Sequence, residues 1–218
     1  NANGGSGTMN PTTGKVDGEV TVSANAFERA GYTFTGWDKA VPDVMPAGNI
    51  VITAQWKKDV YTISYNLDGG KADNPETYEV DTSVITLKRP QRTGYTFIGW
   101  DKDIPDRMPA ENMLLTAKWS KDVYKIAYNL NGGEADNPGT YEVDSSVITL
   151  KTPVRKGYTF TGWSGTGIDG TSKEVVITTG STGDRTYTAN WKENSYTVQF
   201  IPYGDGTTGS MDEMSLMY

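Results

Sequence analysis

The sequence predicts a mostly β fold, with little or no helix, made of small tandem units. One observation is a set of short stretches in which apolar and polar residues alternate, separated by glycine and proline. A second is a phrase that recurs three times at a fixed spacing, which is typical of a repeat protein. The third is the composition of the 218 residues, 36% hydrophobic and 11% aromatic, which can support packed cores.

The recurring phrase is Gly-Tyr-Thr-Phe-x-Gly-Trp. Its copies begin at Gly31, Gly94 and Gly157, each 63 residues after the one before. A second tryptophan, in Thr-Ala-x-Trp, closes each unit, and nine extra residues precede it in the third unit. Large aromatic side chains at fixed places in so small a unit are expected to form its core. The predicted structural core residues are Trp37, Trp56, Trp100, Trp119, Trp163 and Trp191.

Within each unit, alternating segments are predicted to form strands, and glycine and proline to separate them. The phrase itself alternates poorly, so we expect its glycines to bend the chain as it enters the core. In the second unit the expected elements are a strand at 61–65, a glycine turn at 68–70, strand-like residues at 77–80 and 83–87, a break at Pro90, the phrase at 94–100 and a last strand ending at Trp119.

The repeat phase also predicts the domain organisation. Short hinges at 57–60 and 120–123 are expected to join the units. The predicted domains are a partial repeat at 1–60 that lacks its first strand, a complete repeat at 61–123, a complete repeat at 124–195 with a longer loop at 164–186, and the opening strand of a truncated fourth repeat at 196–218.

The composition excludes several classes of chemistry. The chain has no cysteine and no histidine, so thiolate, cysteine–zinc and histidine-based catalysis are excluded. A net charge of −7 argues against nucleic acid and against anionic membrane surfaces. No apolar run is long enough to span a bilayer, and no leader peptide is expected in this stretch.

The combined motif resembles the Listeria–Bacteroides repeat family, which includes the internalin-type B repeat. The residues that carry the resemblance are the Tyr-x-hydrophobic-x-aromatic strand, the Asn/Asp-Gly-Gly turn, the proline, the Gly-Tyr-Thr-Phe-x-Gly-Trp phrase and the closing Thr-Ala-x-Trp. The resemblance implies β-grasp-like, ubiquitin-like units in an elongated tandem array. It also implies a non-catalytic segment of a secreted or surface-exposed bacterial protein, acting as a stalk, a spacer or part of an adhesin.

A second hypothesis is a binding module for a glycan or a host protein. Tyrosine and tryptophan faces can stack on sugar rings, although core or edge packing is the stronger interpretation. The Gly-rich insertion of the third unit is the other candidate surface. The tyrosines considered as ligand contacts are Tyr32, Tyr78, Tyr95, Tyr141 and Tyr158.

The remaining motifs favour ordinary surface structure. The GxGxxG at 165–170 lacks the strand and helix of a dinucleotide site, so it is interpreted as a flexible loop. No catalytic, cofactor or metal site is predicted. Acidic residues could pair for catalysis or bind calcium, but their pattern favours solvated surface charge. These residues are Glu134, Asp136, Asp144, Asp169 and Glu174. The basic residues Lys88, Arg89, Arg92, Arg107 and Lys118 are scattered and form no polybasic run.

One partner is suggested by the repeat phase. The first unit lacks its opening strand, and Tyr196–Phe200 is similar to such a strand. The tail of one molecule is therefore expected to complement the head of another by strand addition. No nucleic acid and no membrane insertion are expected.

Overall fold

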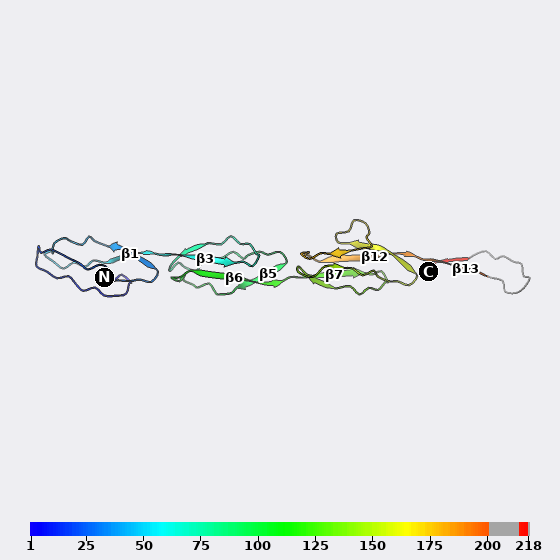
Figure 1. Ribbon diagram of the computed structural model, residues 1–218, viewed down its shortest axis with the longest axis horizontal. Coiled ribbons are helices and arrows are strands. Elements are labelled where there is room, and N and C mark those ends of the chain that lie inside the picture. The colour runs from blue at the N-terminus through cyan, green and yellow to red at the C-terminus, as the bar shows by residue number, and fades with distance from the viewer. Residues whose placement is uncertain (201–213, 218) are drawn as a thin grey trace, which may run out of the picture. The chain divides into compact units, whose positions relative to one another are not determined.

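The computed structural model describes residues 1–200 and the backbone of residues 214–217. Strands separated by turns and irregular loops make up this part of the chain, and none of its residues is helical, so the expected mostly β fold is confirmed (Figure 1). The first repeat contains β1 (Tyr32–Trp37) and β2 (Ala54–Lys58). The second contains β3 (Val60–Asn66), β4 (Thr77–Glu79), β5 (Tyr95–Trp100) and β6 (Met113–Lys121).

The third repeat has the same four strands and two additional short ones. Its strands are β7 (Val123–Asn129), β8 (Thr140–Glu142), β9 (Ile148–Thr149), β10 (Tyr158–Gly165), β11 (Val176–Ile177) and β12 (Arg185–Glu193). They are followed by β13 (Ser195–Val198) and β14 (Met214–Met217), which pair antiparallel.

Each complete repeat is a mixed four-stranded sheet. The strand order is β4-β3-β6-β5 in the second repeat and β10-β12-β7-β8 in the third. The opening strand pairs in parallel with the last strand, β3 with β6 and β7 with β12. The short strands β4 and β8 pair antiparallel with the opening strands. The first and last strands of a repeat therefore lie side by side and run in the same direction.

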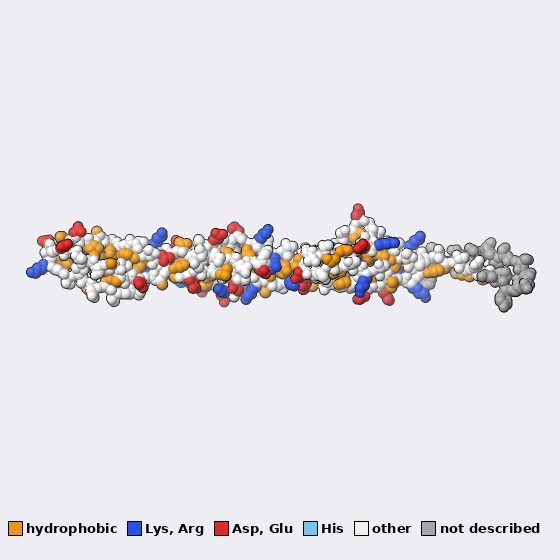
Figure 2. Space-filling model, viewed as in Figure 1, with side chains coloured by type: hydrophobic (Ala, Val, Ile, Leu, Met, Phe, Trp, Pro, Cys, Tyr) orange, Lys and Arg blue, Asp and Glu red, His pale blue; other side chains and the backbone are white. Residues whose placement is uncertain are grey.

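The alternating pattern of the strands buries one face of each sheet. In β3, Ile63 is buried while its neighbours Thr62 and Ser64 are exposed. Ile63 packs in a cluster with Tyr78, Met108 and Leu115. Charged side chains of both signs are spread over the surface in the view of Figure 2, with no large field of one sign.

The recurrent phrase contains a β-bulge. Between β1 and β2 the register shifts from Phe34 to Gly36, and the same shift occurs between Phe160 and Gly162 in the third repeat. Gly36 and Gly162 have φ of 138° and 145°, a region that other residues rarely adopt, as the sequence predicts. The extra residue lets both aromatic rings of the phrase face the core. The Phe34 and Trp37 rings meet edge to face, 5.0 Å apart.

The closing tryptophan of each repeat donates a hydrogen bond to the backbone at the glycine turn. The Trp56 indole N–H donates to the Ala2 carbonyl at 2.9 Å. The equivalent bonds join Trp119 to Leu67 at 3.2 Å and Trp191 to Leu130 at 3.0 Å. These indoles are therefore half-buried with a polar partner, as is usual for tryptophan at the edge of a core.

Trp163 has a different environment from Trp37 and Trp100. Its exposed fraction is 0%, whereas those two are partly exposed. Residues of the insertion cover it: Ser172 exchanges two backbone hydrogen bonds with Trp163, of 2.7 and 2.8 Å. The insertion, predicted as a longer loop at 164–186, also contributes β11, which pairs with β9. It is therefore partly built into the third repeat.

By its internal contacts the described chain divides into two compact units. One comprises residues 1–91 and 97–119, and the other residues 92–96 and the chain from residue 120 onward. Residues 92–96 belong to the second repeat by sequence, yet they pack with the following unit. The packing boundary therefore differs from the boundary of the sequence repeat.

Removal of the Trp163 side chain should be more costly than removal of Trp100. We expect Trp163→Ala to lower the free energy of unfolding by about 3–5 kcal/mol, because a fully buried aromatic leaves a cavity. Trp100→Ala should cost less, since its ring is already partly solvated. Urea unfolding of the two variants, followed by near-UV circular dichroism, compares them. Equal losses would contradict the assignment of Trp163 as the more deeply packed ring.

Candidate functional site at the repeat junctions

Successive repeats are linked by a single residue outside the strands. β2 ends at Lys58 and β3 begins at Val60, so only Asp59 lies between them. Asp122 holds the same place between β6 and β7, and Asn194 between β12 and β13. The expected hinges at 57–60 and 120–123 are therefore largely strand.

The linking residue is held by two hydrogen bonds to the recurrent phrase. Its backbone N–H donates to the glycine carbonyl, and its side-chain oxygen accepts from the threonine hydroxyl. The N–H bonds are Asp59 to Gly31 at 2.9 Å, Asp122 to Gly94 at 3.0 Å and Asn194 to Gly157 at 2.9 Å. The hydroxyl bonds, from Thr33, Thr96 and Thr159 respectively, are each 2.6 Å.

The same glycines leave room for the next repeat. Gly31 and Gly94 have φ of 74° and 77°, in the left-handed region. A Cβ at Gly31 would lie 2.6 Å from Val80 Cγ2, and one at Gly94 would lie 2.5 Å from Val143 Cβ. No side chain fits these positions without movement. The backbone of one repeat therefore meets an aliphatic side chain of the next at van der Waals distance.

The tyrosine of each phrase lies beneath an arginine. The guanidinium carbons of Arg29, Arg92 and Arg155 lie 3.6, 3.8 and 3.5 Å from the ring centroids of Tyr32, Tyr95 and Tyr158. Such cation–π contacts contribute about 0.5–1 kcal/mol each at exposed sites.

Tyr32 also reaches the next repeat. Its hydroxyl donates to Asp81 Oδ2 at 2.7 Å. This hydrogen bond, followed by desolvation, raises the pKa of Tyr32 above its ordinary value. In the third repeat the Tyr158 hydroxyl donates to Glu193 Oε1 at 3.1 Å. Tyr32 and Tyr158 thus have polar partners of their own at the junctions.

An exposed ion pair supplements the junction after the second repeat. Lys121 Nζ lies 2.6 Å from Asp144 Oδ2 and 3.5 Å from Glu142 Oε2. The hydrogen bond from Lys121 holds the pKa of Asp144 below its usual range. Its contribution is therefore present above the ordinary carboxyl pKa and is lost as the pH falls through the lowered value. Both side chains are nearly half exposed, so solvent screening keeps the contribution small.

Two tyrosines considered as ligand contacts are core residues. Tyr78 and Tyr141 are only 5% and 4% exposed, and each belongs to the hydrophobic cluster of its repeat. Their hydroxyls donate to the backbone carbonyls of Glu111 and Gly183. Because each stands alone between polar neighbours on a short strand, the sequence did carry a sign of inward orientation. Neither ring is available for stacking on a sugar.

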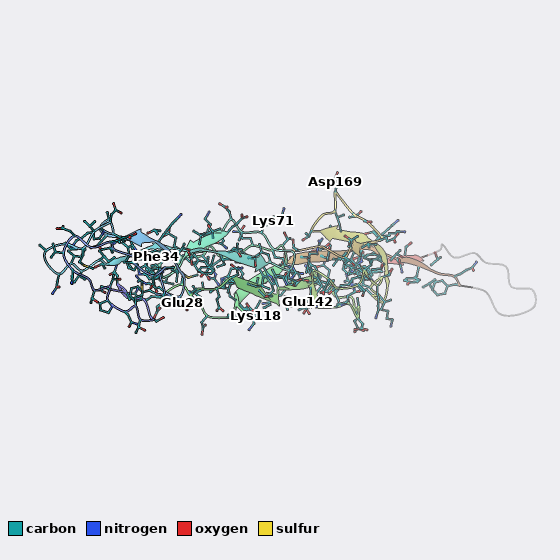
Figure 3. The ribbon with its side chains drawn as sticks, turned by 60° about the vertical axis from the view of Figure 1, so that its left-hand side comes forward. Glu28, Phe34, Lys71, Lys118, Glu142 and Asp169 are labelled. Atoms are coloured by element: carbon teal, nitrogen blue, oxygen red, sulfur yellow. The ribbon has the colours of Figure 1, made fainter. Side chains whose placement is uncertain are left out.

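The other candidate motifs are dispersed. The GxGxxG at 165–170 begins at Gly165, the last residue of β10, and continues into the insertion, where Asp169 points outward at the tip (Figure 3). Asp136 pairs with Lys151 at 2.9 Å, and Asp144 with Lys121. Across the residues described, no three acidic side chains are grouped so that they could hold a metal ion. The same part of the chain contains no helix that could span a membrane.

The expected hinges contain Asp59 and Asp122, but neither these residues nor Val80 and Val143 belong to a motif that predicts a contact at the junctions. Asp59 and Asp122 are 63 residues apart, like the repeats themselves, and each follows a lysine that ends the preceding strand. Val80 and Val143 have the same spacing. The repeat phase could therefore have marked them, but nothing in their residue types indicated that they meet across a junction.

A chain of small mixed sheets joined by one-residue links is a tandem β-repeat protein. The family model described as the Listeria-Bacteroides repeat domain matches residues 61–118 and 124–190, and that of the divergent InlB B-repeat domain matches residues 1–60. The chain belongs to the Listeria-Bacteroides repeat family, as the sequence motif predicted.

Three relatives share this repeat sequence. A protein of Evansella cellulosilytica named as a Gly-rich membrane protein is 28% identical over 90% of this chain, and a second named as a membrane protein is 26% identical over 79%. Internalin H of Listeria monocytogenes is 33% identical over 49%. The matches span 25%, 28% and 24% of these relatives, so the chain corresponds to about a quarter of their length.

Substitution of the junction glycine should destabilise the protein. We expect Gly94→Ala to lower the free energy of unfolding of the compact unit that contains residues 92–96 by about 1–3 kcal/mol. An alanine there would have to adopt a positive φ, and its Cβ would overlap the Val143 side chain. Gly139→Ala is the control, since a Cβ there meets nothing within 4 Å. Thermal unfolding by circular dichroism compares the two. Equal stability of both variants would contradict the close packing at the junction.

Proposed function

We propose that this chain is a non-catalytic spacer segment of a bacterial surface protein, in which the junctions fix the orientation of successive repeats. The observation that carries the proposal is the one-residue link with its two hydrogen bonds and the glycine–valine contact. A linker of several free residues would let neighbouring units rotate. A single clamped residue supports a semi-rigid array, whose reach grows with the number of repeats.

The surroundings of the charged residues support a non-catalytic role. Of the carboxylates that were candidates for catalysis, Asp136 and Asp144 are exposed and paired with lysines, and the described residues contain no group of three acidic side chains that could hold a metal ion. Acid–base catalysis by two carboxyl groups requires them to converge on a cleft. The strand order, with a parallel central pair, supports the β-grasp likeness of the unit.

The relatives support a location at the bacterial surface. Two of them are named as membrane proteins, and the third is an internalin. A repeat segment that accounts for about a quarter of each relative suits a part that positions other domains. We therefore place the segment outside the cell, attached to or released from the surface.

The spacer proposal is tested by a distance measurement across a junction. The chain has no cysteine, so pairs of spin labels can be introduced without removing native thiols. We choose the exposed positions Asn49 and Lys118, in the first and second repeats. Double electron–electron resonance should give a narrow distance distribution. A distribution as broad as that of a free linker would overturn the proposal.

A junction variant sharpens this test. Thr33→Val removes the hydroxyl that donates to Asp59, and Asp59→Gly removes its acceptor. The double variant should broaden the distribution between labels at 49 and 118. Thr35→Val is the matched control, because Thr35 lies in the same strand and is exposed. Broadening by the control alone would contradict the role of the clamp.

A second candidate function is binding of a glycan or host protein at the insertion. A hollow of about 310 Å³ lies beside it, lined by residues that include Asp169, Glu174 and Arg185. Neither the first nor the second repeat has this insertion. If it binds, the full chain should show saturable binding on a mucin, glycan and extracellular-matrix array. Asp169→Ala with Glu174→Ala should weaken that binding, with Asp136→Ala as control. Absence of binding would leave the spacer role alone.

A further inference from the structure

The last strand of the third repeat carries two polar side chains where the second repeat is aliphatic. In the parallel pairing with the opening strand, Arg185 takes the place of Met113. By the same register, Tyr187 takes the place of Leu115. Both changes lie on β12, two residues apart, in the one repeat of the three that also has the insertion.

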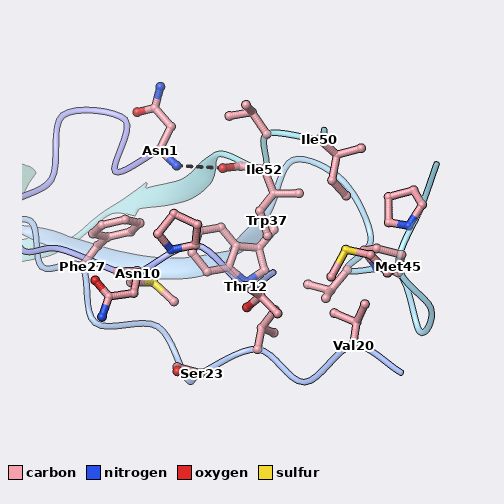
Figure 4. Close-up of a pocket in the computed structure, with 17 residues that line it drawn as sticks. Asn1, Asn10, Thr12, Val20, Ser23, Phe27, Trp37, Met45, Ile50 and Ile52 are labelled. Carbon is pink, nitrogen blue, oxygen red and sulfur yellow. Dashed lines mark hydrogen bonds between the residues drawn. The ribbon is translucent and has the colours of Figure 1, made fainter. Parts of the chain in front are cut away.

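The first repeat agrees with the second at these places. The 63-residue spacing aligns Ile50 and Ile52 with Met113 and Leu115. In the first repeat these two isoleucines line an apolar surface together with Trp37 (Figure 4). The arginine is therefore not part of the common core of the repeat, and its presence calls for a reason specific to the third copy.

Arg185 is half-buried and is held by tyrosine hydroxyls. Its Nε–H donates to Tyr141 Oη at 3.0 Å. This hydrogen bond, supplemented by one to Tyr187, raises the pKa of Arg185 above its ordinary value. The adjacent Asp184 accepts instead from the Lys125 backbone N–H at 2.8 Å, and within the described residues Arg185 is in no ion pair. The guanidinium donors that the tyrosines do not use can bind a carboxylate of a ligand.

Arg185 lines a hollow of about 310 Å³ formed by the insertion and β12. Thr166 fixes one wall: its N–H donates to the Thr186 carbonyl at 3.0 Å, and its Oγ1 accepts from the Thr186 N–H at 3.0 Å. Ser172 fixes another wall through its two backbone hydrogen bonds to Trp163. Pockets for small ligands begin at about 300 Å³, so the hollow has room for a single sugar-sized ring.

Two exposed carboxylates line the same hollow. They belong to Asp169 and Glu174, and neither forms an ion pair in the part of the chain that the structure describes. A carboxylate accepts hydrogen bonds from hydroxyl groups and repels a second carboxylate. A ligand that suits the whole lining therefore has one carboxylate for the arginine and several hydroxyl groups for the acidic side chains.

We propose that this hollow binds an acidic sugar, a single ring with one carboxylate and several hydroxyl groups, as in a uronic acid. The carboxylate lies on the Arg185 guanidinium, and the hydroxyl groups donate to Asp169 and Glu174. This assignment rests on the second candidate function, binding at the insertion. It is independent of the spacer role, which depends on the junctions.

The test is a titration of the full, ¹⁵N-labelled chain with glucuronate, followed by two-dimensional NMR. We expect saturable shifts of the Thr166 and Ser172 amides and of the Arg185 Nε–H, with a Kd on the order of 1 mM for so small a ligand. Glucose lacks the carboxylate and should bind at least about tenfold more weakly. The methyl glycoside of glucuronate stands for the end of a polysaccharide: equal binding supports a chain-terminal residue as the source, and binding of the free acid alone supports the free sugar.

Arg185→Met is the informative variant, because Met113 has the same place in the second repeat and the fold is expected to be kept. It should weaken glucuronate binding at least about tenfold, and a thermal unfolding curve checks its folding. Lys173→Met is the matched control, since it removes one positive charge from an exposed residue of the insertion that does not line the hollow. This control should bind glucuronate as the unmodified chain does.

Three results would overturn the acidic-sugar assignment. They are no saturable shift up to about 20 mM glucuronate, equal affinity for acetate, which has no hydroxyl groups, and equal effects of the two substitutions. Binding to the mucin, glycan and matrix array that survives Arg185→Met would also overturn it, while leaving the binding function of the insertion in place.

Discussion

The parallel pairing of the first and last strands is the constraint on which this structure depends. In an antiparallel pair the last strand would end beside the start of the first. In the parallel pair β3–β6 both strands point the same way, so the chain leaves the repeat at the end opposite to its entry. The next repeat can then begin after one residue. The third repeat keeps this arrangement in β7 and β12 despite its insertion.

The one-residue link explains the composition of the recurrent phrase. The linking residue must be held while the next strand departs, and the glycine carbonyl and threonine hydroxyl of the phrase hold it. The glycine also admits the valine of the following repeat, because no Cβ would fit. The phrase thus serves two purposes: its glycine and threonine form the junction, and its phenylalanine and tryptophan pack into the core. These two purposes give a physical reason why the same glycine, threonine, phenylalanine and tryptophan recur in all three copies of the phrase.

Much of the unit could be predicted from the sequence, because repetition and alternation are local signals. Most of the strands and the bend in the phrase belong to this class. The expected strand at 83–87 is wrong, because only Ser83 forms an isolated bridge there, and of the six tryptophans expected in the core only Trp163 is fully buried. The parallel pairing could not be predicted, since alternation is the same in parallel and antiparallel strands. The links were predicted as hinges because strand ends are poorly defined by propensity. Tyr78 and Tyr141 were considered as ligand contacts, with core packing as the stronger interpretation, and their polar neighbours in the short Thr-Tyr-Glu strands already indicated the inward orientation that the structure shows.

The insertion of the third repeat shows how the unit can diverge without losing its fold. β5 is an edge strand of the sheet in the second repeat. The space beside it is open, because a Cβ placed at Gly99 would meet nothing within 4 Å. At the equivalent Gly162, the Ser172 backbone lies close, and Ser172 pairs with Trp163. An open sheet edge can accept another segment, and here the chain's own insertion does so. Ser172 pairs with Trp163, whereas Thr159 near the start of the same strand holds Asn194. The added residues therefore cover a core tryptophan while the hydrogen bond to the linking residue is kept. Differences between repeats can therefore accumulate at this edge, while the junction residues keep the same hydrogen bonds.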